Sequence, residues 1–291
     1  MEGSFTTFES RFIKSADDTE IYADAAGTRS PAAPVLVLIH GFSMNKAAFN
    51  PMFEDRKWLS SAFLVRYDAR GQGKSRGPLD DEGWESRRMS EDFEAVCKEF
   101  GVTKAFVLGW SLGAAHFVDI INYNTSVTIS GFINSSGLMY ISPPVIFRMA
   151  KPEALVILAE LTQTGSSIEA FQSTAQRFCS FLSDDLTPDL RRALLEGIML
   201  VSSNVAGKLS TRAHDPEKML QEGRDGGLEV LVVTGGKDKL VNATGVRETY
   251  EESGWKKCIH RHLEEGDHMP WLSRPDEYRD LVLSWIQERH H

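Results

Sequence analysis

The strongest chemical signature in this sequence is the segment 109–113, Gly-Trp-Ser-Leu-Gly, a complete G-x-S-x-G pattern centred on Ser111. The pattern places a serine on a sharp strand-to-helix turn, where its hydroxyl stands clear of the chain. The context fits, because residues 105–108 read as a strand and residues from Leu112 onward read as a helix. We therefore predict that Ser111 is a nucleophile. The alternative is a serine that caps a helix in a glycine-bounded turn.

A serine needs a base to remove its proton, and His268 is the best placed of the eight histidines. It follows the last predicted strand, residues 256–263, after the short polar segment 264–267, and it precedes the last predicted helix. Doubly wound folds place their sites in loops at the carboxyl ends of strands. His260 and His262 share one face of that strand, a pattern typical of solvated or packed side chains. We predict that His268 is the general base.

A carboxylate must orient the imidazole, and two candidates lie near His268. Asp238 ends the loop Thr-Gly-Gly-Lys-Asp, which follows the apolar strand 229–233. Asp267 adjoins His268, but neighbours in a loop rarely present their side chains to each other correctly, and we expect Asp267 in a solvated loop. We predict Asp238 as the orienting acid. The alternative is a turn aspartate, since Gly-Gly-Lys-Asp is also good turn chemistry.

An oxyanion formed by attack on a carbonyl needs two hydrogen-bond donors. One is the N–H of Leu112, next to the serine. The other is expected from the segment 40–43, His-Gly-Phe-Ser, which follows the predicted strand 35–39. Because its glycine lets the backbone turn its amides toward the site, we predict the N–H of Phe42 as the second donor.

Apolar runs of strand length alternate with helical patterns over most of the chain. Such runs suit strands buried on both faces of a parallel sheet, and the alternation indicates βαβ units. We predict an α/β fold with a doubly wound, mostly parallel sheet. After a hairpin (9–14 and 19–24), the predicted strands are residues 35–39, 63–67, 105–108, 127–133, 230–233 and 256–263, and the predicted helices are residues 86–100, 112–122, 243–253 and 275–287.

Between residues 138 and 227 only helical patterns occur. Ser166 and Glu169 form a capping box, Thr187 and Pro188 begin a helix whose apolar spacing continues to Val205, and residues 215–216 begin another. We interpret residues 138–227 as a helical lid inserted into a core of residues 1–137 and 228–291. Large apolar residues of this lid are candidates for its core or for the wall of a pocket: Met139, Phe147, Met149, Phe171, Phe178, Phe181 and Met199.

The composition limits the class of protein. Hydrophobic residues make up 42% and charged residues 25%, which indicates a globular chain. A net charge of −9 argues against a nucleic-acid partner, because phosphate binding needs a basic surface. No apolar run is long enough to span a bilayer, and the amino terminus does not resemble a secretory signal. Three widely spaced cysteines indicate neither a disulfide framework nor a zinc site. We expect a cytoplasmic protein.

Five segments in this order resemble the motifs of the α/β-hydrolase superfamily: residues 40–42, 68–75, 109–113, 235–238 and 267–268. The chain order Ser111, Asp238, His268 is also the order of that superfamily. The resemblance extends from about residue 20 to the end, with the lid unmatched. The turn at 109–113 is similar to that of pimeloyl-carrier-protein methyl esterases. The wider pattern resembles enol-lactonases, carbon–carbon bond hydrolases and cofactor-free haloperoxidases. Relatives that open epoxides or remove halide carry aspartate in place of Ser111, so those activities are disfavoured.

The resemblance implies a serine hydrolase that acts on a small or medium hydrophobic ester or lactone through an acyl-enzyme. The apolar lid residues favour such a substrate over a sugar or a peptide. Two alternatives stay open: cleavage of a carbon–carbon bond in a β-diketone-like substrate by the same residues, and a ligand receptor that kept the fold.

No cofactor or metal is expected. Residues 73–75, Gly-Lys-Ser, look like the end of a phosphate-binding loop, but Asp68 stands where that loop needs its first glycine. The spacing of His260, His262 and His268 does not suit a metallohydrolase.

We predict that extensive dialysis against EDTA leaves the rate of ester hydrolysis unchanged, because every proposed group is a side chain or a backbone amide. The control is dialysis without the chelator. A large loss of rate that zinc restores would contradict this expectation.

Overall fold

The computed structural model describes residues 6–78 and 80–290 of the 291-residue chain. Residues 1–5, part of the segment compared above with a secretory signal, lie outside the described residues. Within the described ranges, no helix is long and apolar enough to cross a membrane.

One sheet of eight strands forms the centre of the described structure, in the order β1-β2-β4-β3-β5-β6-β7-β8. The β1–β2 hairpin and the β2–β4 pair are antiparallel, and every other pair is parallel. The doubly wound, mostly parallel sheet predicted from the sequence is therefore confirmed. The strands are β1 (Thr6–Lys14), β2 (Glu20–Gly27), β3 (Val35–Ile39), β4 (Phe63–Tyr67), β5 (Lys104–Trp110), β6 (Thr128–Ser135), β7 (Glu229–Gly235) and β8 (Lys257–Leu263).

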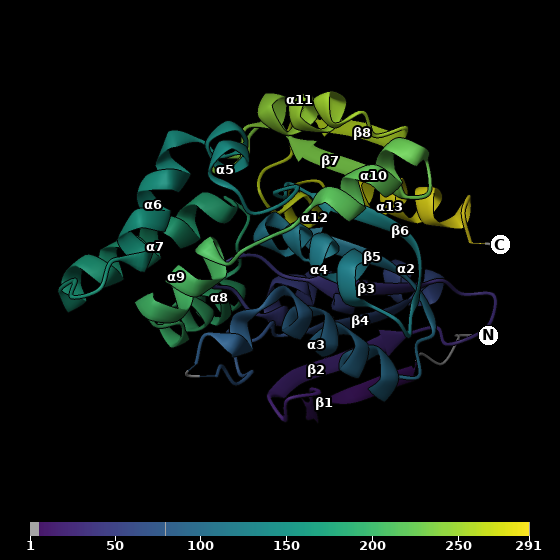
Figure 1. Cartoon of the computed structure of the whole chain (residues 1–291), viewed down its shortest axis with the longest axis horizontal. Coiled ribbons are helices and arrows are strands. Elements are labelled where there is room, and N and C mark those ends of the chain that lie inside the picture. The colour runs from purple at the N-terminus through teal and green to yellow at the C-terminus, as the bar shows by residue number, and fades with distance from the viewer. Residues whose placement is uncertain (1–5, 79, 291) are drawn as a thin grey trace.

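Helices cover both faces of the sheet, which explains why the central strands are apolar without alternation. In β3, Leu36 to Ile39 are all fully buried. Helices α3 and α4 contact each other and lie in front of the sheet in the view of Figure 1. Helices α2 and α13 form a second contacting pair. The helices of this layer structure are α1 (Asn50–Glu54), α2 (Arg56–Ser61), α3 (Ser86–Glu99), α4 (His116–Tyr123), α11 (Ala243–Ser253), α12 (Pro270–Ser273) and α13 (Pro275–Gln287), with 3₁₀ turns η1 (Lys46–Phe49), η2 (Glu82–Trp84) and η3 (Ser111–Ala115).

The segment between β6 and β7, residues 138–227, is called the helical insertion below. Figure 1 shows α5 to α9 gathered beside the sheet, and α10 returning to lie near α4, which it contacts. The elements of the insertion are α5 (Pro143–Met149), α6 (Pro152–Thr162), α7 (Ile168–Leu182), α8 (Pro188–Leu200), α9 (Ser203–Thr211) and α10 (Glu217–Asp225).

Two local predictions for the insertion differ from the structure. The N-cap of α7 is Ser167, whose side chain accepts a hydrogen bond from the Ala170 N–H, and not Ser166. The helix that begins after Thr187 ends at Leu200, and Ser202 caps a separate helix, α9. Consecutive serines make the first choice ambiguous in sequence, and the apolar spacing continues across the break that the Ser202 cap introduces.

A buried ion pair joins Arg212, the residue that follows α9 of the insertion, to helix α4. Arg212 donates to both carboxylate oxygens of Asp119, at 2.7 and 2.6 Å, and the side chains are only 4% and 0% exposed. His214 lies 3.3 Å from the same carboxylate. Burial alone would raise the pKa of Asp119, but Arg212 and His214 beside it lower that pKa below its usual value. The pair is therefore ionised at neutral pH.

We predict that Asp119→Asn lowers the free energy of unfolding by roughly 3–5 kcal/mol, because it leaves the buried guanidinium of Arg212 without a counter-charge. The matched control is Glu99→Gln, which breaks the exposed Arg11–Glu99 pair and should change stability by less than about 1 kcal/mol. Urea denaturation measures both. Equal effects of the two substitutions would show that the buried pair contributes no more than an exposed one.

Candidate active site

Ser111 occupies a strained turn directly after β5, as the first residue of η3. Its φ is +56°, in the left-handed region that residues with a side chain rarely adopt. The turn is held because the chain packs very closely around it: a Cβ atom on Gly113 would lie 2.3 Å from the carbonyl oxygen of Ile39, and one on Gly41 would lie 2.9 Å from Ser111 Cβ. The strand-to-helix turn thus presses the serine against the loop after β3.

Asp238 and His268 meet in loops that follow neighbouring strands, β7 and β8. His268 Nδ1 and Asp238 Oδ2 are 2.8 Å apart, and both side chains are 1% exposed. Because an ionised carboxylate can only accept hydrogen bonds, the ring proton lies on Nδ1 and leaves Nε2 free as an acceptor.

Backbone amides hold the Asp238 carboxylate from its other side. Oδ1 accepts hydrogen bonds from the N–H groups of Leu240 and Val241, at 2.8 and 2.9 Å. Burial alone would raise the pKa of Asp238, but the nearby His268 and these hydrogen bonds lower it overall. This carboxyl is therefore ionised at neutral pH although it is buried.

Asp267, the other carboxylate that the sequence offers, forms its hydrogen bonds in the described structure with groups other than the His268 ring. It accepts hydrogen bonds from Ser183 Oγ, Ser273 Oγ and the Met269 N–H, at 2.6, 3.0 and 2.8 Å. Only 6% of Asp267 is exposed, so the expectation that it lies in a solvated loop is wrong. The loop looks polar in sequence, but the helical insertion covers it.

His40 fixes the loop that follows β3. Its Nε2 accepts a hydrogen bond from the Ala69 N–H, at 2.9 Å, so the ring proton is on Nδ1 and is donated to the Gly41 carbonyl, also at 2.9 Å. Burial lowers the pKa of His40, against an opposing effect of Asp68. No hydrogen bond among the described residues uses the N–H of Phe42, which remains available to a ligand.

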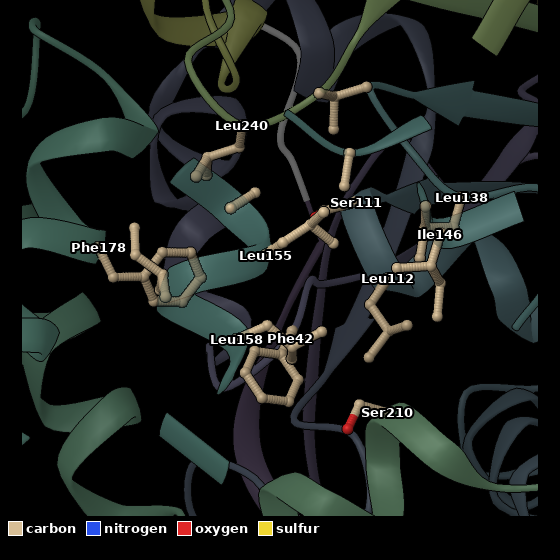
Figure 2. A pocket seen from close by; sticks show the side chains of 14 residues that line it. Phe42, Ser111, Leu112, Leu138, Ile146, Leu155, Leu158, Phe178, Ser210 and Leu240 are labelled. Atoms are coloured by element: carbon tan, nitrogen blue, oxygen red, sulfur yellow. The ribbon is translucent and has the colours of Figure 1, made fainter. Parts of the chain in front are cut away.

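An apolar pocket opens beside Ser111, with a volume of about 90 Å³. Figure 2 shows side chains from the core and from the helical insertion converging on it, and Ser210 from α9 lies at its margin. Of the seven apolar insertion residues singled out in the sequence, Phe178 lines this pocket. The lining residues are Phe42, Ser111, Leu112, Leu138, Ile146, Ala150, Ala154, Leu155, Ile157, Leu158, Phe178, Ser210, Leu240 and Val241.

The sequence model of the Alpha/beta hydrolase family matches residues 36–281. The chain belongs to that family. Among solved structures, it is similar to a putative aryl esterase from Burkholderia cenocepacia (18% identity, TM-score 0.82, covering 97% of this chain and 99% of that one). It is also similar to an esterase from a Rhodococcus species (20% identity, TM-score 0.82, 97% and 100% covered). A third similar structure is the N-acyl homoserine lactonase AidH (17% identity, TM-score 0.76, 98% and 98% covered). No curated protein sequence matches it.

One contact in this hydrolase-family chain, between Trp110 and His268, was not predicted from the sequence. Trp110, the residue before Ser111, donates its indole N–H to the carbonyl of His268 at 2.7 Å, and the two rings lie 5.4 Å apart. The hydrogen bond spans 158 residues of sequence. A buried tryptophan usually finds a partner for its N–H, which is a signal in the sequence that a partner exists but not which one.

No group of three or more His, Cys, Asp or Glu side chains in the described part of the chain could hold a metal ion.

Proposed function

We propose that this protein is a serine hydrolase that cleaves a small or medium hydrophobic carboxylic ester or lactone through an acyl-enzyme. The observation that carries the proposal is the buried 2.8 Å hydrogen bond between His268 and Asp238. It fixes the tautomer that a base needs if it is to take the proton of Ser111. A hydrolase fold shared with esterases and a lactonase supports the assignment.

In the proposed mechanism, Ser111 Oγ attacks the substrate carbonyl while His268 Nε2 takes its proton. The N–H groups of Phe42 and Leu112 stabilise the oxyanion. His268 then returns the proton to the leaving alcohol, which departs as the C–O bond breaks. Water, deprotonated by the same imidazole, then attacks the acyl group; the bond to Ser111 Oγ breaks, the carboxylic acid leaves, and the imidazolium returns its proton to Ser111 Oγ. Asp238 stays ionised and stabilises the imidazolium in both steps.

The pocket supports the substrate class. Apart from Ser111 and Ser210, the residues that line it are apolar. A sugar or a peptide would lose hydrogen bonds to water there without gaining partners, which costs several kcal/mol. The helical insertion supplies nine of the fourteen lining residues, and we propose that it acts as the lid of the site. The described cysteines are all free, which supports a location in the cytoplasm.

The test is a screen with p-nitrophenyl esters of graded acyl length beside a panel of lactones. We expect the highest kcat/KM with a short or medium acyl chain and a decline for the longest, because the pocket is small. Ser111→Ala should lower kcat by on the order of 10⁴-fold or more, since the members of such a triad act as a unit.

A fluorophosphonate probe provides a second measurement that does not depend on the substrate. It should label the wild type and not Ser111→Ala. The matched control is Ser210→Ala, which removes the other hydroxyl of the pocket and should keep the label. Labelling of Ser111→Ala would place the nucleophile elsewhere.

We predict that Asp238→Asn lowers kcat by roughly 10³- to 10⁴-fold, because the amide presents the wrong partner to Nδ1 and traps the unproductive tautomer. Asp267→Asn should cost about tenfold or less, because its remaining carbonyl oxygen can still accept the Met269 N–H. Steady-state kinetics of both variants, with folding checked by circular dichroism, decide the matter. A reversed ranking would remove Asp238 from the mechanism.

A further inference from the structure

Asp267 is a loop residue with four hydrogen bonds, three to its carboxylate and one from its backbone N–H. One carboxylate oxygen accepts the Met269 N–H at 2.8 Å and Ser273 Oγ at 3.0 Å, and the Asp267 N–H donates to Ser273 Oγ at 3.0 Å. These contacts close a tight turn with His268 at its centre. The proposed mechanism uses none of them.

The second carboxylate oxygen of Asp267 is held by the helical insertion. Ser183, the residue that ends α7, donates to it at 2.6 Å across 84 residues of sequence. The Ser183 hydroxyl is oriented for this, because its oxygen also accepts the Asp185 N–H at 3.1 Å.

Burial makes this contact important for the loop. Ser183 and Asp267 are 5% and 6% exposed, and burial raises the pKa of Asp267 against the effect of its hydrogen bonds. A buried carboxylate oxygen that loses its donor keeps its desolvation cost without compensation. The loop would therefore rearrange to find water or another donor, and His268 would move with it.

Helix α7 also carries a wall of the pocket. Phe178, five residues before Ser183, lines the pocket and lies against Phe42, with ring centroids 6.5 Å apart. The same helix thus contacts the space for the substrate at one point and the histidine loop at another.

We propose that Asp267 is a positioning residue that couples the helical insertion to the catalytic base through Ser183. When α7 is seated on the core, the Ser183–Asp267 hydrogen bond holds the turn 267–269 and keeps His268 in place; when α7 lifts, the turn is released. This inference rests on the proposed role of His268 in hydrolysis.

The first test compares Ser183→Ala with Ser183→Thr, which keeps a hydroxyl. Ser183→Ala should lower kcat for a p-nitrophenyl ester by about 10- to 100-fold, the range expected when a catalytic group is displaced by about 1 Å or less. KM should change by less than about twofold, since the pocket walls are untouched. Ser183→Thr should restore most of kcat. The matched control is Ser180→Ala on the same helix, whose hydroxyl donates to the backbone carbonyl of Arg177, and it should behave as wild type.

A double-mutant cycle tests whether Ser183 acts through Asp267. In an Asp267→Ala background, Ser183→Ala should cause less than about a twofold further loss of kcat, because the partner is already absent. If Asp267→Ala does not fold, the hydrogen-exchange comparison of Ser183→Ala with the wild type and Ser180→Ala tests the coupling instead. Independent, multiplicative losses would overturn the coupling, as would a kcat of Ser183→Ala within twofold of wild type.

Amide hydrogen exchange separates failure of this inference from failure of the proposed function. A wild type that hydrolyses no ester or lactone would refute the function. The link would still be tested, because Met269 N–H should exchange faster in Ser183→Ala than in the wild type or Ser180→Ala. Unchanged protection of Met269 would refute the link whatever the activity.

Discussion

The left-handed backbone of Ser111 is the constraint on which the rest of the site depends. Such a conformation costs on the order of 1–3 kcal/mol and persists only when the surroundings enforce it. Here Gly113 lies against the carbonyl oxygens of Ile39 and His40, so closely that a Cβ atom would come within 2.3 and 2.6 Å of them. The turn after β5 and the loop after β3 therefore fix each other. One contact, between the turn after β5 and the end of β3, thus fixes the positions of both the serine and the Phe42 amide.

The helical insertion forms polar contacts with the loops after β3, β7 and β8 and with helix α4, which follows Ser111. Asn45, in the segment after Phe42, donates to the Ala193 carbonyl at 2.7 Å. Lys151 bonds to the Asp238 carbonyl, Ser183 to the Asp267 carboxylate, and Arg212 to Asp119 on the helix after Ser111. A segment that only covered a pocket would need apolar contacts alone. These polar contacts make the insertion part of the frame that positions the site.

Local signals in the sequence are enough for much of the fold. Strands β3 and β4 and helices α11 and α13 begin and end where predicted, because continuous apolar runs or helical periodicity end there at polar residues or at glycine and proline. The sequence also predicts that Asp238 and His268 lie in loops, because each follows a predicted strand. The hydrogen-bond partners of Trp110 and Asp267 could not be predicted in this way. Those bonds join residues 158 and 84 positions apart, and they depend on how the insertion and the sheet pack.

The proposed catalytic residues and most of the residues that line the pocket belong to different parts of the chain, and this separation affects how substrate specificity can change by substitution. The groups that we propose for proton transfer follow the strands of the core, whereas nine of the fourteen residues that line the pocket belong to the helical insertion. Substitutions at wall positions such as Leu155 or Leu158 change the shape of the pocket without altering the groups that we propose for proton transfer. Substitution is more constrained at three insertion residues that bond to the core, Lys151, Ser183 and Arg212. A directed-evolution library aimed at substrate specificity would therefore vary wall positions such as Leu155 and Leu158 and keep the core-bonded residues of the insertion unchanged.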